Sequence, residues 1–203
     1  MDTASSTTEL LSWNDTIKIV LGFVSSALLV WLGVFIRARL RKRILKRSVW
    51  NVLKNHTSLD GWLMALDEMC TAANGGNAYT ISFDVSVPLS KLVSELAALD
   101  PLKSDIYYDL LGWEEVVRKG LKKINELQME LAKSRTDGID WSTENISLRK
   151  MISSQCDVLR RDVISMYSAQ LDLMKYIQIQ RNDAVDPVET LEKSLSKTSK
   201  TDS

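Results

Sequence analysis

The longest uninterrupted apolar run in the chain lies near its start, over residues 19–36. It reads IVLGFVSSALLVWLGVFI, which is 18 consecutive residues without a charged side chain. A helix needs about 20 predominantly apolar residues to cross the hydrocarbon core of a bilayer, and Lys18 can reach the interface by snorkelling. The pattern therefore predicts a transmembrane helix over residues 16–36, preceded by a short extracytoplasmic tail at residues 1–15.

Two other interpretations of this run are a buried core helix and a cleaved signal peptide. A core helix is usually shorter and is seldom followed at once by a cluster of cations. A signal peptide has a basic start, a shorter apolar region and small residues at its cleavage site. Here the start is acidic and the run ends at Arg37, so the pattern favours a membrane anchor.

A basic juxtamembrane segment follows the run over residues 37–47, with seven cations and no acidic residue. Lys and Arg next to a span stay on the cytoplasmic side, which predicts an outer amino terminus and a cytoplasmic domain after the span. The charge also predicts contact with anionic lipid headgroups, which we favour over nucleic acid because the lipid surface already accounts for it. The predicted headgroup contacts are Arg37, Arg39, Arg41, Lys42, Arg43, Lys46 and Arg47.

Small residues recur on one face of the expected span, at Gly22, Ser26 and Gly33. Such a stripe lets two helix backbones approach closely in a membrane. It indicates transmembrane packing between copies of the chain, although small residues are common in membrane helices.

The cytosolic domain is expected over residues 48–182 and is mainly α-helical. Ser58 is a good N-cap for a helix over residues 59–73, whose apolar positions share one face. A second short helix is expected over residues 90–99. Asp100 then reads as the N-cap of a longer helix that has proline at its first position.

Residues 79–87 alternate strictly between apolar and polar side chains, which is the pattern of one short β-strand. No other stretch alternates as well, so its partner strand is unidentified and lies within the chain or in another copy. The alternative is an extended segment packed along the helices.

Two long helices are expected over residues 102–134 and 142–180, with apolar residues at alternating threes and fours. Joined by a short turn, they predict an antiparallel coiled-coil hairpin or helical bundle, with Gln170 as a polar residue that sets the register. The expected hairpin interface consists of Val117, Leu121, Ile124, Leu131, Ile152, Leu159, Val163, Met166, Leu173 and Ile177. Residues 183–203 are expected to be a flexible polar tail, with at most a brief helical turn over 187–195.

Charge and chemistry-bearing residues change this picture little. The chain is neutral overall, with 26 basic and 26 acidic residues, but the part after residue 47 is mildly acidic. Cys70 and Cys156 are far apart and are expected to be reduced thiols; they could form one disulfide, but the spacing supports neither a disulfide framework nor a zinc site. His56 is the only histidine and lacks a nucleophile motif. Paired carboxylates such as Glu114-Glu115 read as solvated faces.

These patterns indicate no nucleic-acid partner and suggest no enzyme, cofactor, metal ion or small-molecule substrate. We expect a single-pass membrane-anchored scaffold or adaptor, which self-associates or binds protein partners through its cytosolic helical domain. The alternative is a membrane-acting effector or channel subunit, in which several spans assemble under the control of that domain.

Overall fold

The computed structural model describes residues 13–55, 58–75, 79, 87–136, 143–177 and 187–201. These residues are almost entirely helical, and none of them forms a β-strand. The mainly α-helical fold expected from the sequence is therefore confirmed for the described part of the chain.

The chain divides into two units, Met1–Arg43 and Ile44–Ser203. The helix α1 (Trp13–Lys54) contributes residues to both of them. The second unit starts four residues before the expected domain start at residue 48, because Leu45 is already buried there together with Val49, Trp50 and Leu53.

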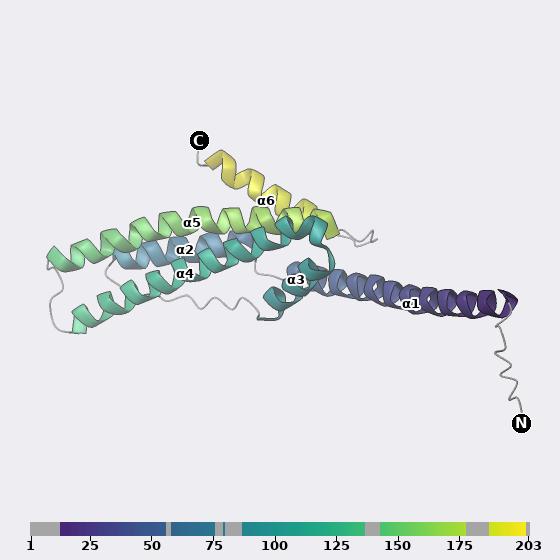
Figure 1. The fold of residues 1–203 in the computed structure, drawn as a ribbon. Helices are drawn as coiled ribbons and strands as arrows, with labels where there is room; N and C mark the ends of the chain where they lie inside the picture. Colours follow the sequence, from purple (N-terminus) through teal and green to yellow (C-terminus); the bar gives the residue numbers. More distant parts are fainter. Residues whose placement is uncertain are drawn as a thin grey trace, which may run out of the picture. The chain divides into compact units, whose positions relative to one another are not determined.

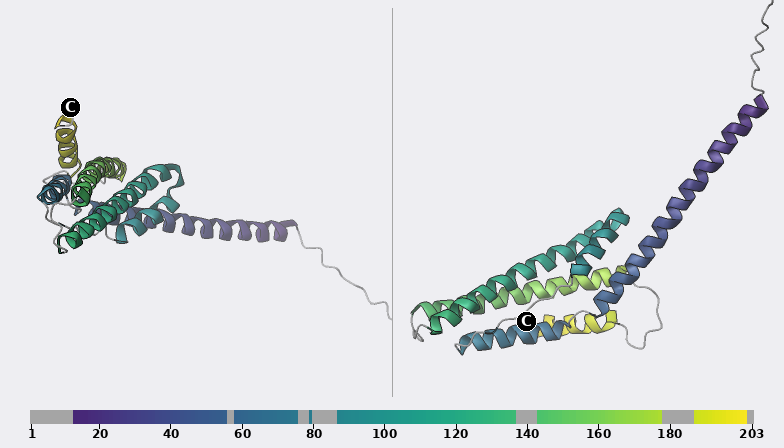
Figure 2. Two further views of the ribbon diagram at one scale, coloured as in Figure 1. Left: turned by 90° about the vertical axis from the view of Figure 1, so that its left-hand side faces the viewer. Right: turned by 90° about the horizontal axis from the view of Figure 1, so that it is seen from below.

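The second unit is a helical bundle built around α5 (Thr143–Ile177). The helix α4 (Ser104–Thr136) packs along one side of α5. The helices α2 (Leu59–Asn74) and α6 (Pro187–Thr201) lie on its other side. Figure 1 labels these helices, and the right-hand view of Figure 2 shows α5 between α4 on one side and α2 and α6 on the other.

Helix α2 begins where the sequence predicted. The Ser58 hydroxyl accepts a hydrogen bond from the backbone N–H of Gly61 at 3.2 Å, which satisfies one of the donors that a helix start leaves open. One face of α2 is buried along its whole length, and it includes Leu59, Trp62, Leu66 and Met69. This face packs against α5.

Helix α3 (Val87–Leu99) begins at the last residue of the predicted strand. Val87 is helical, so the strand does not reach this position; residues 80–86 lie outside the described residues. Pro88 falls in the first turn of α3, where its missing N–H costs no hydrogen bond. Before this helix, the backbone N–H of Tyr79 donates to Oε1 of buried Gln128 at 3.2 Å.

The carboxyl-terminal segment also differs from the sequence expectation. Residues 187–201 form the helix α6, where the sequence predicted a flexible tail with at most a brief helical turn. Val188 and Leu191 are buried, and Lys175 of α5 forms an ion pair with Glu192 at 2.5 Å. Since few apolar residues are needed to dock a short helix, the polar composition of the segment concealed it.

The ten side chains of the predicted hairpin interface are all buried in the bundle. The two long helices carrying them approach closely at Gly120, where an added Cβ atom would lie 3.0 Å from Cδ1 of Leu159. Gln170 is buried as well, but its Nε2 donates to the carbonyl of Leu53 in α1 at 3.4 Å. It therefore contacts the last turn of α1, not a polar partner on α4.

Candidate functional site

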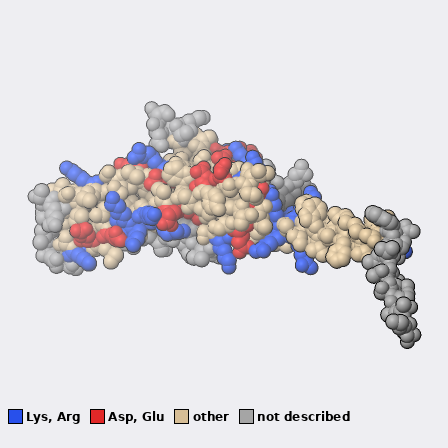
Figure 3. Space-filling model, in the orientation of Figure 1, with Lys and Arg blue, Asp and Glu red and all other residues tan. Residues whose placement is uncertain are grey.

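The first candidate site is the apolar part of α1. It is the one helix among the described residues that is long and apolar enough to cross a membrane. Its large apolar side chains are exposed from Ile17 to Ile36, including Phe23 at 75% and Leu29 at 70%. Figure 3 shows this stretch as tan surface, with neither acidic nor basic side chains between its ends.

The polar groups inside this apolar stretch are satisfied by the helix itself. The hydroxyl of Ser25 donates to the carbonyl of Gly22 at 3.0 Å, and that of Ser26 to the carbonyl of Phe23 at 2.9 Å. Such back-bonding leaves few polar groups for an apolar solvent to accommodate. An added Cβ atom at Gly22 or Gly33 would meet no described atom within 4 Å, so the predicted packing stripe is open.

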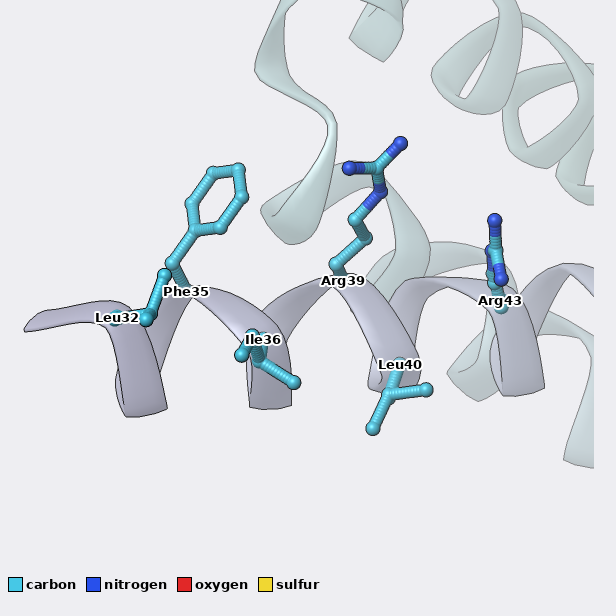
Figure 4. A pocket seen from close by; sticks show the side chains of 6 residues that line it. All are labelled: Leu32, Phe35, Ile36, Arg39, Leu40 and Arg43. Carbon is cyan, nitrogen blue, oxygen red and sulfur yellow. The ribbon is translucent and has the colours of Figure 1, made fainter. Parts of the chain in front are cut away.

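At the end of the apolar run, an aromatic side chain is followed by two basic side chains along one side of α1. Phe35, Arg39 and Arg43 follow one another at intervals of four residues and project from the same side, whereas Ile36 and Leu40 lie on another side (Figure 4). The ring of Trp31 stacks on that of Phe35 with centroids 5.7 Å apart. This arrangement joins an apolar and a cationic surface on one helix face.

The seven predicted headgroup contacts do not share one environment. Arg37, Arg39, Arg41, Arg43 and Arg47 are exposed. Lys42 and Lys46 are half-buried, and Nζ of Lys46 lies 4.2 Å from the ring centroid of Tyr176 in α5. This cation–π contact gives Lys46 a protein partner, so it belongs to the bundle.

Tyr176 connects Lys46 to a buried cluster around Asp100, which the sequence pattern did not predict. A carboxylate oxygen of Asp100 accepts hydrogen bonds from the hydroxyl of Tyr176 at 2.5 Å and from that of Tyr107 at 3.2 Å. The two rings meet edge to face, with centroids 6.1 Å apart. The cluster joins α4, α5, the start of the second unit and the turn before α4.

Asp100 therefore has a different role from the predicted one. The 3₁₀ turn η1 (Pro101–Lys103) precedes α4, and the Asp100 side chain makes no capping hydrogen bond to it. Burial, and then the negative charge of Asp100, raises the pKa of Tyr107. Burial also raises the pKa of Tyr176. Both phenols consequently stay protonated over the physiological pH range, and their hydroxyl groups donate hydrogen bonds to the carboxylate.

Glu114 in α4 is a second buried carboxyl group, which corrects its interpretation as part of a solvated face. Its side chain is only 3% exposed, and Oε2 has no hydrogen-bond partner among the described residues. Burial raises its pKa to about 7, while the charge of Arg118 lowers it in part. The burial of Glu114 could have been predicted from the sequence, because the apolar residues Leu110 and Val117 fall on the same helix face.

A third feature is exposed apolar surface on the two long helices of the bundle. Tyr108 and Val116 are 60% and 42% exposed, and their spacing of eight residues places them on the same face of α4. Further exposed apolar side chains of these helices are Met129, Ile146, Met151 and Val158. The face of the bundle that Figure 3 shows carries interspersed acidic and basic side chains.

Among the residues that the structure describes, no group of three or more His, Cys, Asp or Glu side chains is placed to hold a metal ion. His56 lies outside the described residues.

The fold and these surfaces define a class of protein: a helical bundle preceded by one helix that is long and apolar enough to cross a membrane. No family model, no curated protein and no solved structure matches the chain.

Proposed function

We propose that the chain is a single-pass membrane protein whose helical bundle lies in the cytoplasm and assembles with other copies of the chain as a scaffold. The observation that supports the membrane anchor is the exposed apolar stretch of α1. None of its 18 most apolar consecutive residues is buried. An apolar surface of this size on a soluble protein would be an aggregation hazard. A bilayer would cover it completely.

The proposed orientation rests on the cations that follow the apolar stretch. Exposed arginines at residues 37, 39, 41, 43 and 47 lie on its carboxyl-terminal side, and such residues stay in the cytoplasm. They are also the proposed contacts for anionic lipid headgroups. Of the seven predicted contacts, this set omits Lys46, because Tyr176 already contacts it, and Lys42, because it is half-buried.

The proposed anchor is tested by fractionation and protease protection of the full chain with a carboxyl-terminal tag. We expect the intact chain in the membrane pellet after carbonate extraction, with the tag protected from protease added outside sealed cells. A chain that begins after residue 36, as measured by its intact mass, would identify a cleaved signal sequence. Protein in the supernatant, or a tag digested from outside, would likewise contradict the proposal.

The proposed assembly rests on the exposed apolar side chains of the long helices, above all Tyr108 and Val116 on one face of α4. Burying such side chains at an interface is favourable, and aromatic residues often provide much of the binding energy. Ser25 and Ser26 satisfy their hydroxyl groups within α1, so the span offers little polar lining for a conduit. This favours a scaffold over a channel subunit.

Assembly is tested by cross-linking and mass measurement of the full chain in mild detergent. We expect an oligomer that Val116→Asp weakens at least tenfold, because a charge would be buried at the contact. Met64→Asp is the matched control, since Met64 is an exposed apolar residue on α2. A strictly monomeric chain, or equal effects of the two substitutions, would rule out assembly through this face of α4.

A further inference from the structure

The two cysteines of the chain lie on helices that pack against each other. Cys70 belongs to α2 and Cys156 to α5, and both are free thiols. Cys156 is buried, whereas Cys70 is half-buried and therefore accessible to a small reagent. Their separation in the sequence concealed this relation.

Two contacts fix the register between α2 and α5. Asp67 of α2 forms an ion pair with Arg160 of α5. One turn further along α2, Sγ of Cys70 lies 3.4 Å from Oγ of Ser153. A step forward along α2 therefore corresponds to a step backward along α5, so the two helices are antiparallel here.

This register places Cys156 near Cys70, one turn along α5 from Ser153, which Cys70 contacts. Ser153, Cys156 and Arg160 are spaced by three and four residues, so they share one face of α5. Ser153 and Arg160 both contact α2, and Cys156 lies between them on that face. Burial raises the pKa of Cys156 to about 12, and its electrostatic interaction with Cys70 is the next contribution.

We propose that Cys70 and Cys156 form an intrachain disulfide, which locks α2 onto α5 when the protein meets a disulfide oxidant. In a reducing cytoplasm the pair stays as two thiols. The proposal does not depend on the membrane anchor, because both residues belong to the helical bundle.

The reaction with oxidised glutathione proceeds in two exchange steps. The accessible Cys70 loses its proton, attacks one sulfur of the glutathione disulfide and releases one glutathione thiol. Cys156 then loses its proton and attacks the Cys70 sulfur of the mixed disulfide, which releases the second glutathione. Two protein thiols are oxidised and one glutathione disulfide is reduced. The second step is slow near neutral pH, because Cys156 is almost entirely protonated.

The test uses the full chain in detergent, incubated with oxidised glutathione at pH 8 and then unfolded in the presence of a maleimide. After unfolding, we expect single chains that are not linked to one another, have lost two hydrogen atoms each and bind no maleimide. Digestion should yield a linked peptide pair containing Cys70 and Cys156. Reduction should restore two labelled thiols. The oxidised protein should unfold at a higher urea concentration, because the cross-link restricts the unfolded chain.

Matched variants test whether the register between α2 and α5 determines which pair of cysteines forms the intrachain disulfide. Ser153→Cys combined with Cys156→Ser should also form the intrachain bond, because position 153 contacts Cys70 directly. Met64→Cys combined with Cys70→Ser should not, because Met64 is 64% exposed on α2. Circular dichroism checks that each variant keeps its helices. Wild-type protein that stops at the mixed disulfide, or that forms only links between chains, overturns the proposal.

Discussion

At the residue scale, Glu114 makes the stability of the bundle depend on pH. Its pKa is raised to about 7 by burial, so between pH 4.5 and 7 the folded chain binds more protons than the unfolded chain. Stability therefore falls as the pH rises through this range and levels off above it. A shift of this size corresponds to about 3 kcal/mol.

Substituting Glu114→Gln should remove this dependence. We expect wild-type protein to lose about 3 kcal/mol more unfolding free energy than the variant between pH 4.5 and pH 8, as measured by urea unfolding in detergent. The comparison uses the pH dependence of each protein, so any constant effect of the amide cancels. Parallel pH profiles of the two proteins would show that Glu114 titrates normally.

Tyr176 stabilises the bundle through its hydroxyl group as well as its ring. Tyr176→Phe removes the 2.5 Å hydrogen bond to buried Asp100 and keeps the ring that Lys46 contacts. Hydrogen bonds to charged groups contribute about 1.5–3 kcal/mol, so we expect a loss of this size in urea unfolding. Tyr108→Phe is the control, since Tyr108 is 60% exposed; equal losses would argue against a role for the cluster.

Asp100 shows which residue roles a sequence cannot assign. The pair Asp100-Pro101 has the local pattern of a helix start, and a turn does begin there. The direction of the carboxylate is set by Tyr107 and Tyr176, and Tyr176 is 76 residues away. The same holds for Lys46 and Gln170, whose partners come from distant helices.

At the element scale, two glycines of α4 have opposite surroundings. Gly112 is exposed, and an added Cβ atom there would meet no described atom within 4 Å, whereas at Gly120 it would lie 3.0 Å from buried Leu159. Gly112→Ala should stabilise the fold by up to about 1 kcal/mol through helix propensity. At Gly120→Ala, overpacking of about 1–3 kcal/mol should cancel or exceed that gain.

Thermal unfolding followed by circular dichroism compares the two alanine variants. Gly112→Ala should raise the midpoint, and Gly120→Ala should leave it unchanged or lower it. A similar rise in both variants would mean that α4 and α5 do not approach closely at Gly120.

The helices themselves follow local rules, which is why most of them could be predicted. The N-cap of α2 and the spacing of apolar residues in α4 and α5 place these elements within a few residues of their observed bounds. The carboxyl-terminal segment could not be assigned in this way. Its sequence is polar, and α6 depends on the burial of Val188 and Leu191 in the bundle.

At the scale of the whole molecule, the proposed anchor makes a prediction about charge. Leu28→Arg places a cation in the middle of the apolar stretch, which costs about 2.5–3.5 kcal/mol in a membrane. We expect a marked loss of the chain from the carbonate-resistant membrane fraction. Leu40→Arg is the matched control, because Leu40 is similarly exposed but lies among the basic residues.

The control should stay in the membrane, because Arg39 and Arg41 already flank position 40. If Leu28→Arg stays there equally well, the apolar stretch is not the element that holds the protein in the membrane.

The sequence by itself determined the mainly helical class and the apolar helix near the start, because both follow from spacing within one continuous segment. It also identified ten side chains of the core through the alternation of threes and fours. The tertiary structure alone decided that Asp100 accepts hydrogen bonds from two tyrosine hydroxyls, that Lys46 contacts the ring of Tyr176 and that Cys70 of α2 contacts Ser153 of α5. These relations join residues that are far apart in the chain, so they exist only once the helices have packed.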